Sequence, residues 1–179
     1  MKRICLAIVL AVNLSSAAFA ESVSERTGIN SALGIAPRTE DFIKEAATSD
    51  MLEIEAARIA QQKKGVPAEK VFAEQMIADH TKTSTELKDL VPPDLKSALP
   101  TELDEISQKH LDKLRDTRDQ AFASVYAPME VSAHKDAVSL FERYAKGGED
   151  PNLKDWAGKT LPSLRHHLEM AEEMDKNRK

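Results

Sequence analysis

Residues that end helices divide most of this sequence into long segments, and their placement constrains the fold more than any other feature. The divisions are Gly65, Pro92-Pro93 and Gly147-Gly148, and the segments between them are rich in Ala, Leu, Lys and Glu, which favour helices. Pro128 falls inside one segment and should kink its helix or mark the true start of that helix. We expect long helices at about residues 39–64, 67–92, 118–146 and 150–175, and a shorter helix at about 101–117.

The lengths of the connections predict how these helices pack. Only a few residues separate the first two long helices, and only a few separate the last two, so each pair should form an antiparallel hairpin. The crossover between the hairpins is long and contains the extra short helix. This order of connections predicts an all-α, ferritin-like four-helix bundle over residues 39–176, with residues 177–179 as a tail. No stretch in this range is long and apolar enough to span a bilayer.

The first residues of the chain predict its compartment. A short basic start precedes an apolar run at residues 4–12, and Ala18-Phe19-Ala20 offers the small residues that a signal peptidase requires. We therefore expect residues 1–20 to be a signal peptide that is cut after Ala20, and the protein to be periplasmic. Residues 21–38 mix Ser, Gly, Asn, Thr and Pro without a helical period, so we expect a flexible leader there.

Composition narrows the partners and the chemistry. The chain carries 25 Lys and Arg against 30 Asp and Glu, and loss of Lys2 and Arg3 with the signal peptide would change the net charge from −5 to −7. We therefore expect no nucleic-acid partner. Cys5, the one cysteine, lies in the apolar run, so the exported protein could form neither a disulfide nor a thiolate metal site.

Each long helix has a seam of mostly apolar and small residues spaced alternately three and four apart, with one ionisable residue in each seam. The seams read Phe42, Ala46, Ser49, Glu53, Ala56 and Ala60; Ala73, Met76, His80, Thr83, Leu87 and Leu90; Val131, His134, Val138, Phe141 and Ala145; and Leu153, Ala157, Thr160, Leu164, His167, Ala171 and Met174. Counted from the hairpin turns at about 1.5 Å per residue, the ionisable residues differ in height by roughly 5 to 10 Å. They could therefore cluster near the middle of the bundle. They are Glu53, His80, His134 and His167.

A carboxylate and three imidazoles in a helical core suggest a metal site, because buried ionisable groups are costly unless they pair or bind a metal. Neutral imidazole and carboxylate suit zinc, copper or iron, whereas the thioether of Met76, one turn before His80, would suit copper(I). The supporting candidates are Met76, Met51, Met129, Tyr126 and Asp79. The alternative is a purely structural network in which the histidines bond one another, Glu53 or the Tyr126 hydroxyl. The methionines would then be core filler.

Several segments of the sequence follow the pattern of a known family. They are Asp41-Phe42, Met51-Leu52-Glu53-Ile54, Phe72-Ala73-Glu74-Gln75-Met76-Ile77-Ala78-Asp79-His80, Tyr126 with Met129 and His134, and Leu161-Pro162-Ser163-Leu164-Arg165-His166-His167-Leu168. Through these segments the chain resembles the bacterial DUF4142 family over about residues 41–171. The resemblance implies a ferritin-like fold, an envelope location and a pattern that includes His80, His134 and His167, whereas His166 is additional. It implies no established activity.

One departure bears on catalysis. Di-iron ferritin-like enzymes carry Glu-x-x-His on two helices and a further Glu on each of the others. In this chain the residue three positions before each seam histidine is apolar: Ile77, Val131 and Leu164. A carboxylate-rich di-iron site is therefore not expected, nor is ferroxidase or oxygenase activity.

These observations lead to three hypotheses for function. The first is a non-enzymatic periplasmic bundle that serves envelope stress tolerance and binds copper, zinc or iron through its core histidines. The second is an interaction or chaperone-like protein, with a protein partner or a second copy of itself, whose buried His, Glu and Tyr network is purely structural. The third, and weakest, is a metal-dependent oxidoreductase.

Overall fold

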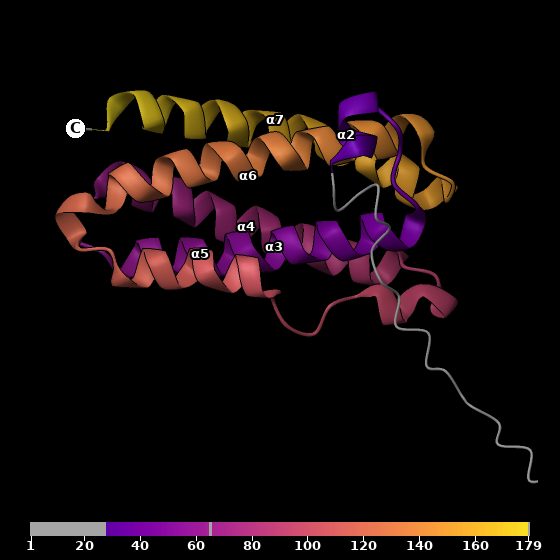
Figure 1. Ribbon diagram of the computed structural model, residues 1–179, viewed down its shortest axis with the longest axis horizontal. Helices are drawn as coiled ribbons and strands as arrows, with labels where there is room; N and C mark the ends of the chain where they lie inside the picture. Colours follow the sequence, from indigo (N-terminus) through magenta and orange to yellow (C-terminus); the bar gives the residue numbers. More distant parts are fainter. Residues whose placement is uncertain (1–27, 65, 179) are drawn as a thin grey trace, which may run out of the picture.

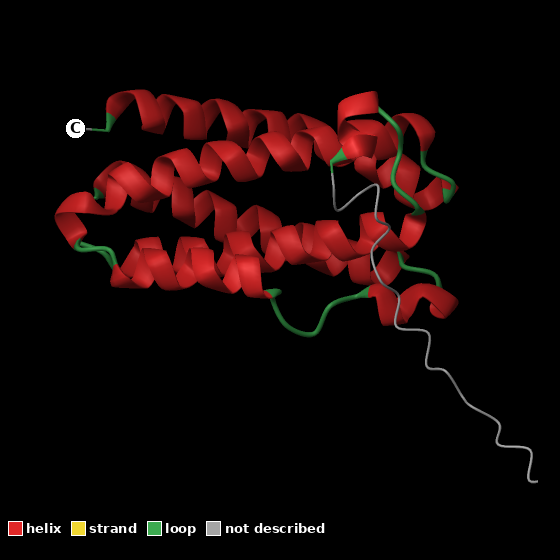
Figure 2. Cartoon of the chain, in the orientation of Figure 1, coloured by secondary structure: helices red, strands yellow, loops and turns green. Residues whose placement is uncertain are grey.

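The computed structural model describes residues 28–64 and 66–178. This part of the chain contains seven helices and no strand, so the expectation of an all-α protein is confirmed (Figure 2). The expected signal peptide, residues 1–20, lies outside the described residues. The helices are α2 (Ile29–Leu33), α3 (Thr39–Gln62), α4 (Pro67–Leu90), the 3₁₀ helix η1 (Pro93–Ala98), α5 (Glu105–Asp116), α6 (Asp119–Gly147) and α7 (Pro151–Asn177).

Four long helices lie side by side as two antiparallel hairpins (Figure 1). The first hairpin is α3 with α4 and the second is α6 with α7, and each of these pairs is in extensive contact. The hairpins also touch each other, through α4 with α7 and α3 with α6. Between them, η1 and α5 carry the chain back along α3, so that α4 and α6 begin at the same end of the molecule.

Local sequence explains where several helices begin. Asp104 caps α5 by accepting a hydrogen bond from the backbone N–H of Ser107, and Asp150 caps α7 by accepting from the N–H groups of Asn152 and Leu153. Pro67 and Pro151 lie at the first positions of their helices, where the missing N–H costs no hydrogen bond.

Pro128 lies inside α6 and does not mark its start, because the helix begins at Asp119. A proline in a helix removes the hydrogen bond to the carbonyl four residues earlier, which here belongs to Ser124. That carbonyl instead accepts a hydrogen bond from Arg178 Nη1, at 3.3 Å, beyond the end of α7. The second hairpin therefore supplies its own replacement for the bond that Pro128 removes.

Part of the expected leader is in contact with the bundle. Within residues 28–38, α2 is helical, and Ser31 lies 3.1 Å from Ser139 of α6, hydroxyl to hydroxyl. Arg143 Nη1, also from α6, donates to the backbone carbonyl of Ile35 at 2.9 Å. These contacts attach the described end of the leader to the second hairpin.

Two apolar clusters make up the core, and a polar layer separates them. One cluster includes Phe42, whose ring stacks on Tyr144 with centroids 3.8 Å apart, and the other includes Phe72 and Phe122. Along every long helix the residues of one cluster precede the polar layer and those of the other follow it. The polar layer thus lies near the middle of the bundle and receives side chains from all four long helices.

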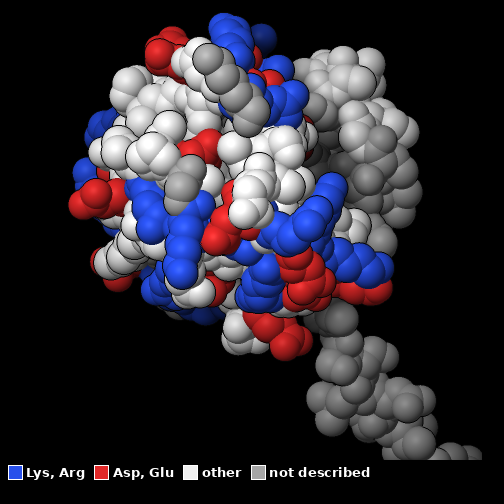
Figure 3. All heavy atoms as spheres, turned by 90° about the vertical axis from the view of Figure 1, so that its left-hand side faces the viewer, with Lys and Arg blue, Asp and Glu red and all other residues white. Residues whose placement is uncertain are grey.

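None of the described helices combines the length and apolar character needed to cross a bilayer. Figure 3 looks at the end of the bundle where α3 turns into α4 and α5 into α6, and there basic and acidic side chains are interspersed.

Candidate metal centre

Three buried histidines form a triangle in the polar layer. His80 comes from α4, His134 from α6 and His167 from α7, and each is at most 2% exposed. Their ring centroids are 5.8 Å apart for His80 and His134, and 5.5 Å apart for the other two pairs. One ring nitrogen from each histidine lies within 4.8 Å of those of the other two. The three residues that the seams predicted to cluster are therefore brought together.

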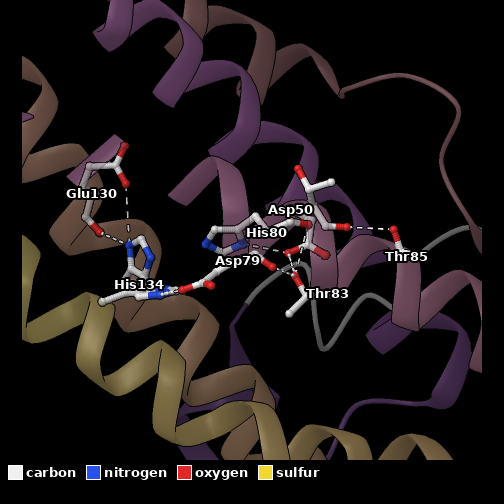
Figure 4. A network of polar contacts seen from close by, with 9 residues as sticks. Asp50, Asp79, His80, Thr83, Thr85, Glu130 and His134 are labelled. Atoms are coloured by element: carbon white, nitrogen blue, oxygen red, sulfur yellow. Dashed lines mark hydrogen bonds and ion pairs between the residues drawn. The ribbon is translucent and has the colours of Figure 1, made fainter. Parts of the chain in front are cut away.

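A buried carboxylate orients the ring of His80. The Nδ1 atom of His80 donates to Asp50 Oδ1 of α3 at 2.8 Å, and Thr83 Oγ1 donates to the same oxygen at 2.9 Å (Figure 4). Burial would lower the pKa of His80, but the hydrogen bond to Asp50 and the charge of Glu53 raise it above its ordinary value. The pKa of Asp50 is itself raised, chiefly by burial.

The other two rings are held in the same manner. His167 Nε2 donates to Asp79 Oδ2 at 2.8 Å, and Asp79 also accepts from Gln75 Nε2 at 2.6 Å. His134 Nδ1 donates to the backbone carbonyl of Glu130, one turn earlier in α6, at 2.9 Å (Figure 4). Burial lowers the pKa of His134, and burial together with the other two imidazoles lowers that of His167 to about 4.

Each imidazole ring therefore has one nitrogen that makes a hydrogen bond and one nitrogen that makes none. His80 Nε2, His134 Nε2 and His167 Nδ1 are buried and have no hydrogen-bond partner among the described residues. A neutral imidazole that donates through one nitrogen has a lone pair on the other. When all three rings are neutral, as metal binding requires, the triangle contains three buried lone pairs without a partner among the described residues, which is uncommon in a folded core.

Two buried glutamates adjoin the triangle. Glu53 of α3 is 2% exposed and Glu130 of α6 is 0% exposed, and one ligand atom from each lies within 4.8 Å of the other and of a nitrogen of His134. Burial and the Glu53 charge raise the pKa of Glu130 well above its usual value. Burial would also raise the pKa of Glu53, but the neighbouring imidazoles, His134 first, lower it. Glu53 is thus the carboxylate that carries the negative charge beside the histidines.

A groove between α4 and α7 leads to this layer from the surface. It has a volume of about 460 Å³, and its lining includes both His80 and His167. Asp79, whose side chain is 33% exposed, lines the same groove, as does Trp156, whose Nε1 donates to Glu86 Oε2 at 2.9 Å. A small solute that enters the groove therefore meets two of the three imidazoles.

The supporting residues expected from the sequence have different surroundings. Asp79 is the hydrogen-bond partner of His167. Tyr126 is buried close to Glu130, and burial is the main reason that the pKa of its phenol is raised well above the usual value. Met76 belongs to the apolar cluster around Phe72, Met129 is partly buried and packs against that cluster, and Met51 is half-buried on α3.

Sequence reasoning missed two carboxylates of the layer, Asp50 and Glu130. The seam of α3 was expected to pass through Ser49, but Ser49 is half-buried and Asp50 is buried. The seam of α6 was expected to pass through Val131, but it passes through Glu130 instead. Glu130 stands four residues before His134, and Asp50 three before Glu53, and such spacings on one helix face could have indicated both.

Most of the chain can be placed in a protein family. No curated protein and no solved structure matches the chain. A family model described as a domain of unknown function, DUF4142, matches residues 24–174, and so confirms the resemblance seen in the sequence. Because this match covers most of the chain, the protein belongs to the DUF4142 family.

Proposed function

We propose that the protein is a periplasmic metal-binding bundle in which His80, His134, His167 and Glu53 hold one transition-metal ion. The observation that carries the proposal is the set of three buried, unpartnered ring nitrogens on three different helices. Metal-binding histidines almost always donate their other N–H to a carboxylate or a backbone carbonyl. His80, His134 and His167 each make such a bond.

The geometry of the three histidines is close to what a tetrahedral ion requires of three of its ligands. Two nitrogens that bind the same tetrahedral zinc lie about 3.3 Å apart, because each is about 2.0 Å from the metal. The ligand atoms of the triangle lie within 4.8 Å of one another, so small side-chain movements bring them onto one ion. Three imidazoles and one carboxylate suit zinc, and copper(II) and iron(II) accept the same donors.

The purely structural alternative explains the site less well. A polar network that only fixes the helix register is stabilising when all its members are satisfied, and a half-satisfied network is costly. In the described chain, the three imidazoles face one another without a hydrogen bond between them. A bound ion would satisfy all three nitrogens at once, and the groove between α4 and α7 offers it a path of entry.

The wider setting is part of the same proposal. The order of the two hairpins and the long crossover supports a ferritin-like arrangement, a fold in which metals bind between facing helices. The N-terminal sequence supports export with removal of residues 1–20. A cysteine-free bundle suits an oxidising compartment, where holding transition-metal ions would serve envelope stress tolerance.

The decisive experiment is native mass spectrometry of the purified protein after loading with zinc, copper(II) or iron(II) and removal of excess metal. At least one of these ions should remain bound to the wild type. Binding should be lost in His80→Leu and His134→Leu, because each removes one of the nitrogens at the centre of the triangle.

Matched controls are available on the surface of the bundle. His110→Leu and His166→Leu change exposed histidines of α5 and α7 and should bind the metal as the wild type does. A wild type that retains none of the three metals at neutral pH would contradict the proposal. The structural network would then be the better account of the layer.

A further inference from the structure

The polar layer contains more ligand atoms than one metal ion uses. Two groups of three residues could each hold an ion: His80, His134 and His167 form one, and Glu53, Glu130 and His134 form the other. The second group is as buried as the first, since Glu53 and Glu130 are 2% and 0% exposed. Because both groups include His134, they are adjacent.

Among the described residues, only imidazoles offer the second group a counter-charge. In the described part of the chain no lysine or arginine pairs with either glutamate, and the one charge partner of Glu130 is the His134 ring, 3.7 Å away. Two ionised carboxylates at this distance repel each other strongly in a dry core unless a proton or a cation lies between them.

Unpartnered buried atoms surround the same point. Glu53 Oε2, both carboxylate oxygens of Glu130 and the Tyr126 hydroxyl have no hydrogen-bond partner within standard geometry among the described residues. Tyr126 is 0% exposed and lies one turn before Glu130 on α6. In the metal-free protein a proton on Glu130, shared with Glu53, offsets part of the cost of burying these oxygens, and a cation between the carboxylates would take the place of that proton.

The ligand atoms can be divided between two ions. His134 has a single free nitrogen, because its Nδ1 donates to the Glu130 carbonyl, so it can bind only one of them. With His134 assigned to the histidine group, the second position has only oxygen donors. One carboxylate oxygen of Glu53 can be directed at the histidines and its other oxygen at Glu130. A carboxylate shared in this way suits two metal ions that are about 3.5 to 4 Å apart, which is common for paired metal sites.

We infer that the bundle binds a second divalent cation between Glu53 and Glu130, and that the Glu53 carboxylate bridges it to the metal on the three histidines. The inference rests on the proposed function, since the bridge requires a first ion. Carboxylate oxygens favour a harder cation than imidazoles do, so the second position suits manganese or magnesium better than copper. The inferred second site modifies the expectation that this layer is poor in carboxylates. Glu130, four residues before His134 on α6, supplies a carboxylate that a search for Glu-x-x-His does not find.

The test is a sequential titration followed by native mass spectrometry. Protein loaded with one equivalent of zinc is titrated with manganese(II), and we expect a species with one zinc and one manganese per chain. In Glu130→Gln, which keeps the size of the side chain, zinc should remain and manganese should be lost. The matched control is Glu169→Gln, an exposed residue of α7, which should bind both ions.

The outcomes separate the two proposals. A wild type that binds one zinc and no second ion overturns the dinuclear site and leaves the histidine site intact. Equal manganese binding by the wild type and a folded Glu130→Gln variant also overturns it, because the second ion then lies elsewhere. If zinc itself does not bind, both proposals fail. If Glu130→Gln does not fold, Glu130→Asp takes its place in the comparison, because a side chain shorter by one CH₂ keeps the carboxylate but draws it away from the second ion and should weaken manganese binding.

Discussion

At the scale of single residues, the hydrogen-bonded nitrogen of each histidine determines what the free nitrogen can do. Asp50 and Asp79 accept from two of the rings and so fix both their orientation and their tautomer. A negative partner also makes the opposite nitrogen a stronger donor to a metal. These two aspartates should therefore affect metal affinity without touching the metal.

The first prediction concerns Asp50. Asp50→Asn removes the negative charge beside His80 Nδ1, and metal affinity should fall about 10- to 100-fold, as is usual when such a partner is changed. Competition with a chelator of known affinity measures the loss. Asp155→Asn is the control, because Asp155 pairs with Lys159 on the exposed surface of α7. Unchanged affinity in Asp50→Asn would mean that Asp50 does not prepare His80 for binding.

The second prediction concerns the metal-free protein in acid. The pKa of His167 falls from 6.5 to about 4 in the folded state, so between these values the unfolded chain binds a proton that the folded chain does not. Stability should therefore decrease as pH falls from about 6.5 to 4, by roughly 3 kcal/mol for this group at 1.36 kcal/mol per pKa unit. The lowered pKa of His134 acts in the same direction, and the raised pKa of His80 opposes it.

Urea unfolding at several pH values, with a chelator present, measures this dependence. His167→Gln should flatten the curve in that interval, because it removes the group that titrates. The neighbouring His166→Gln should keep the wild-type slope, since His166 is exposed. Parallel curves for the wild type and His167→Gln would show that His167 is not the source of the acid sensitivity.

At the scale of helices, the apolar seams predicted the buried face of α7 better than that of α6. The seam of α7 is correct throughout, because its seven residues are all buried, His167 included. In α6 the buried face includes Glu130 and Ala137, each one residue before the expected Val131 and Val138. A seam is recognised by the spacing of its apolar residues, so the pattern favours Val131 over Glu130. A layer of buried carboxylates breaks that pattern, and this is why Asp50 and Glu130 escaped prediction.

The third prediction concerns α5, the helix in the crossover. Only three of its twelve residues are buried, Ser107, Leu111 and Leu114, and its other side faces solvent. A helix with so few buried contacts opens locally at a small cost in free energy. Backbone amides of α5 should therefore exchange with deuterium faster than those of α6, which has ten buried residues. Equal protection of α5 and α6 would show that the crossover unfolds only with the whole bundle.

At the scale of the whole molecule, the polar layer joins the two hairpins. Glu53, His80, His134 and His167 come from α3, α4, α6 and α7, one residue from each long helix. Heights counted from the hairpin turns were enough to predict this meeting, because helical rise is regular. The hydrogen bonds that orient each ring depend on side-chain directions across helices, which no single-helix pattern contains.

The last prediction follows from that arrangement. An ion that binds only the folded state stabilises it by about 2.7 kcal/mol when its concentration is 100 times its dissociation constant. For a domain of this size each kcal/mol raises the melting temperature by about 2 to 4 °C, so saturating zinc should raise it by roughly 5 to 10 °C. Because each long helix supplies a ligand, zinc should slow deuterium exchange at the middle of α3, α4, α6 and α7 together. His134→Leu should show neither effect, and His166→Leu should show both. Slower exchange in only one hairpin would place the ion elsewhere, because an ion in the layer cannot stabilise α6 and α7 without also holding α3 and α4.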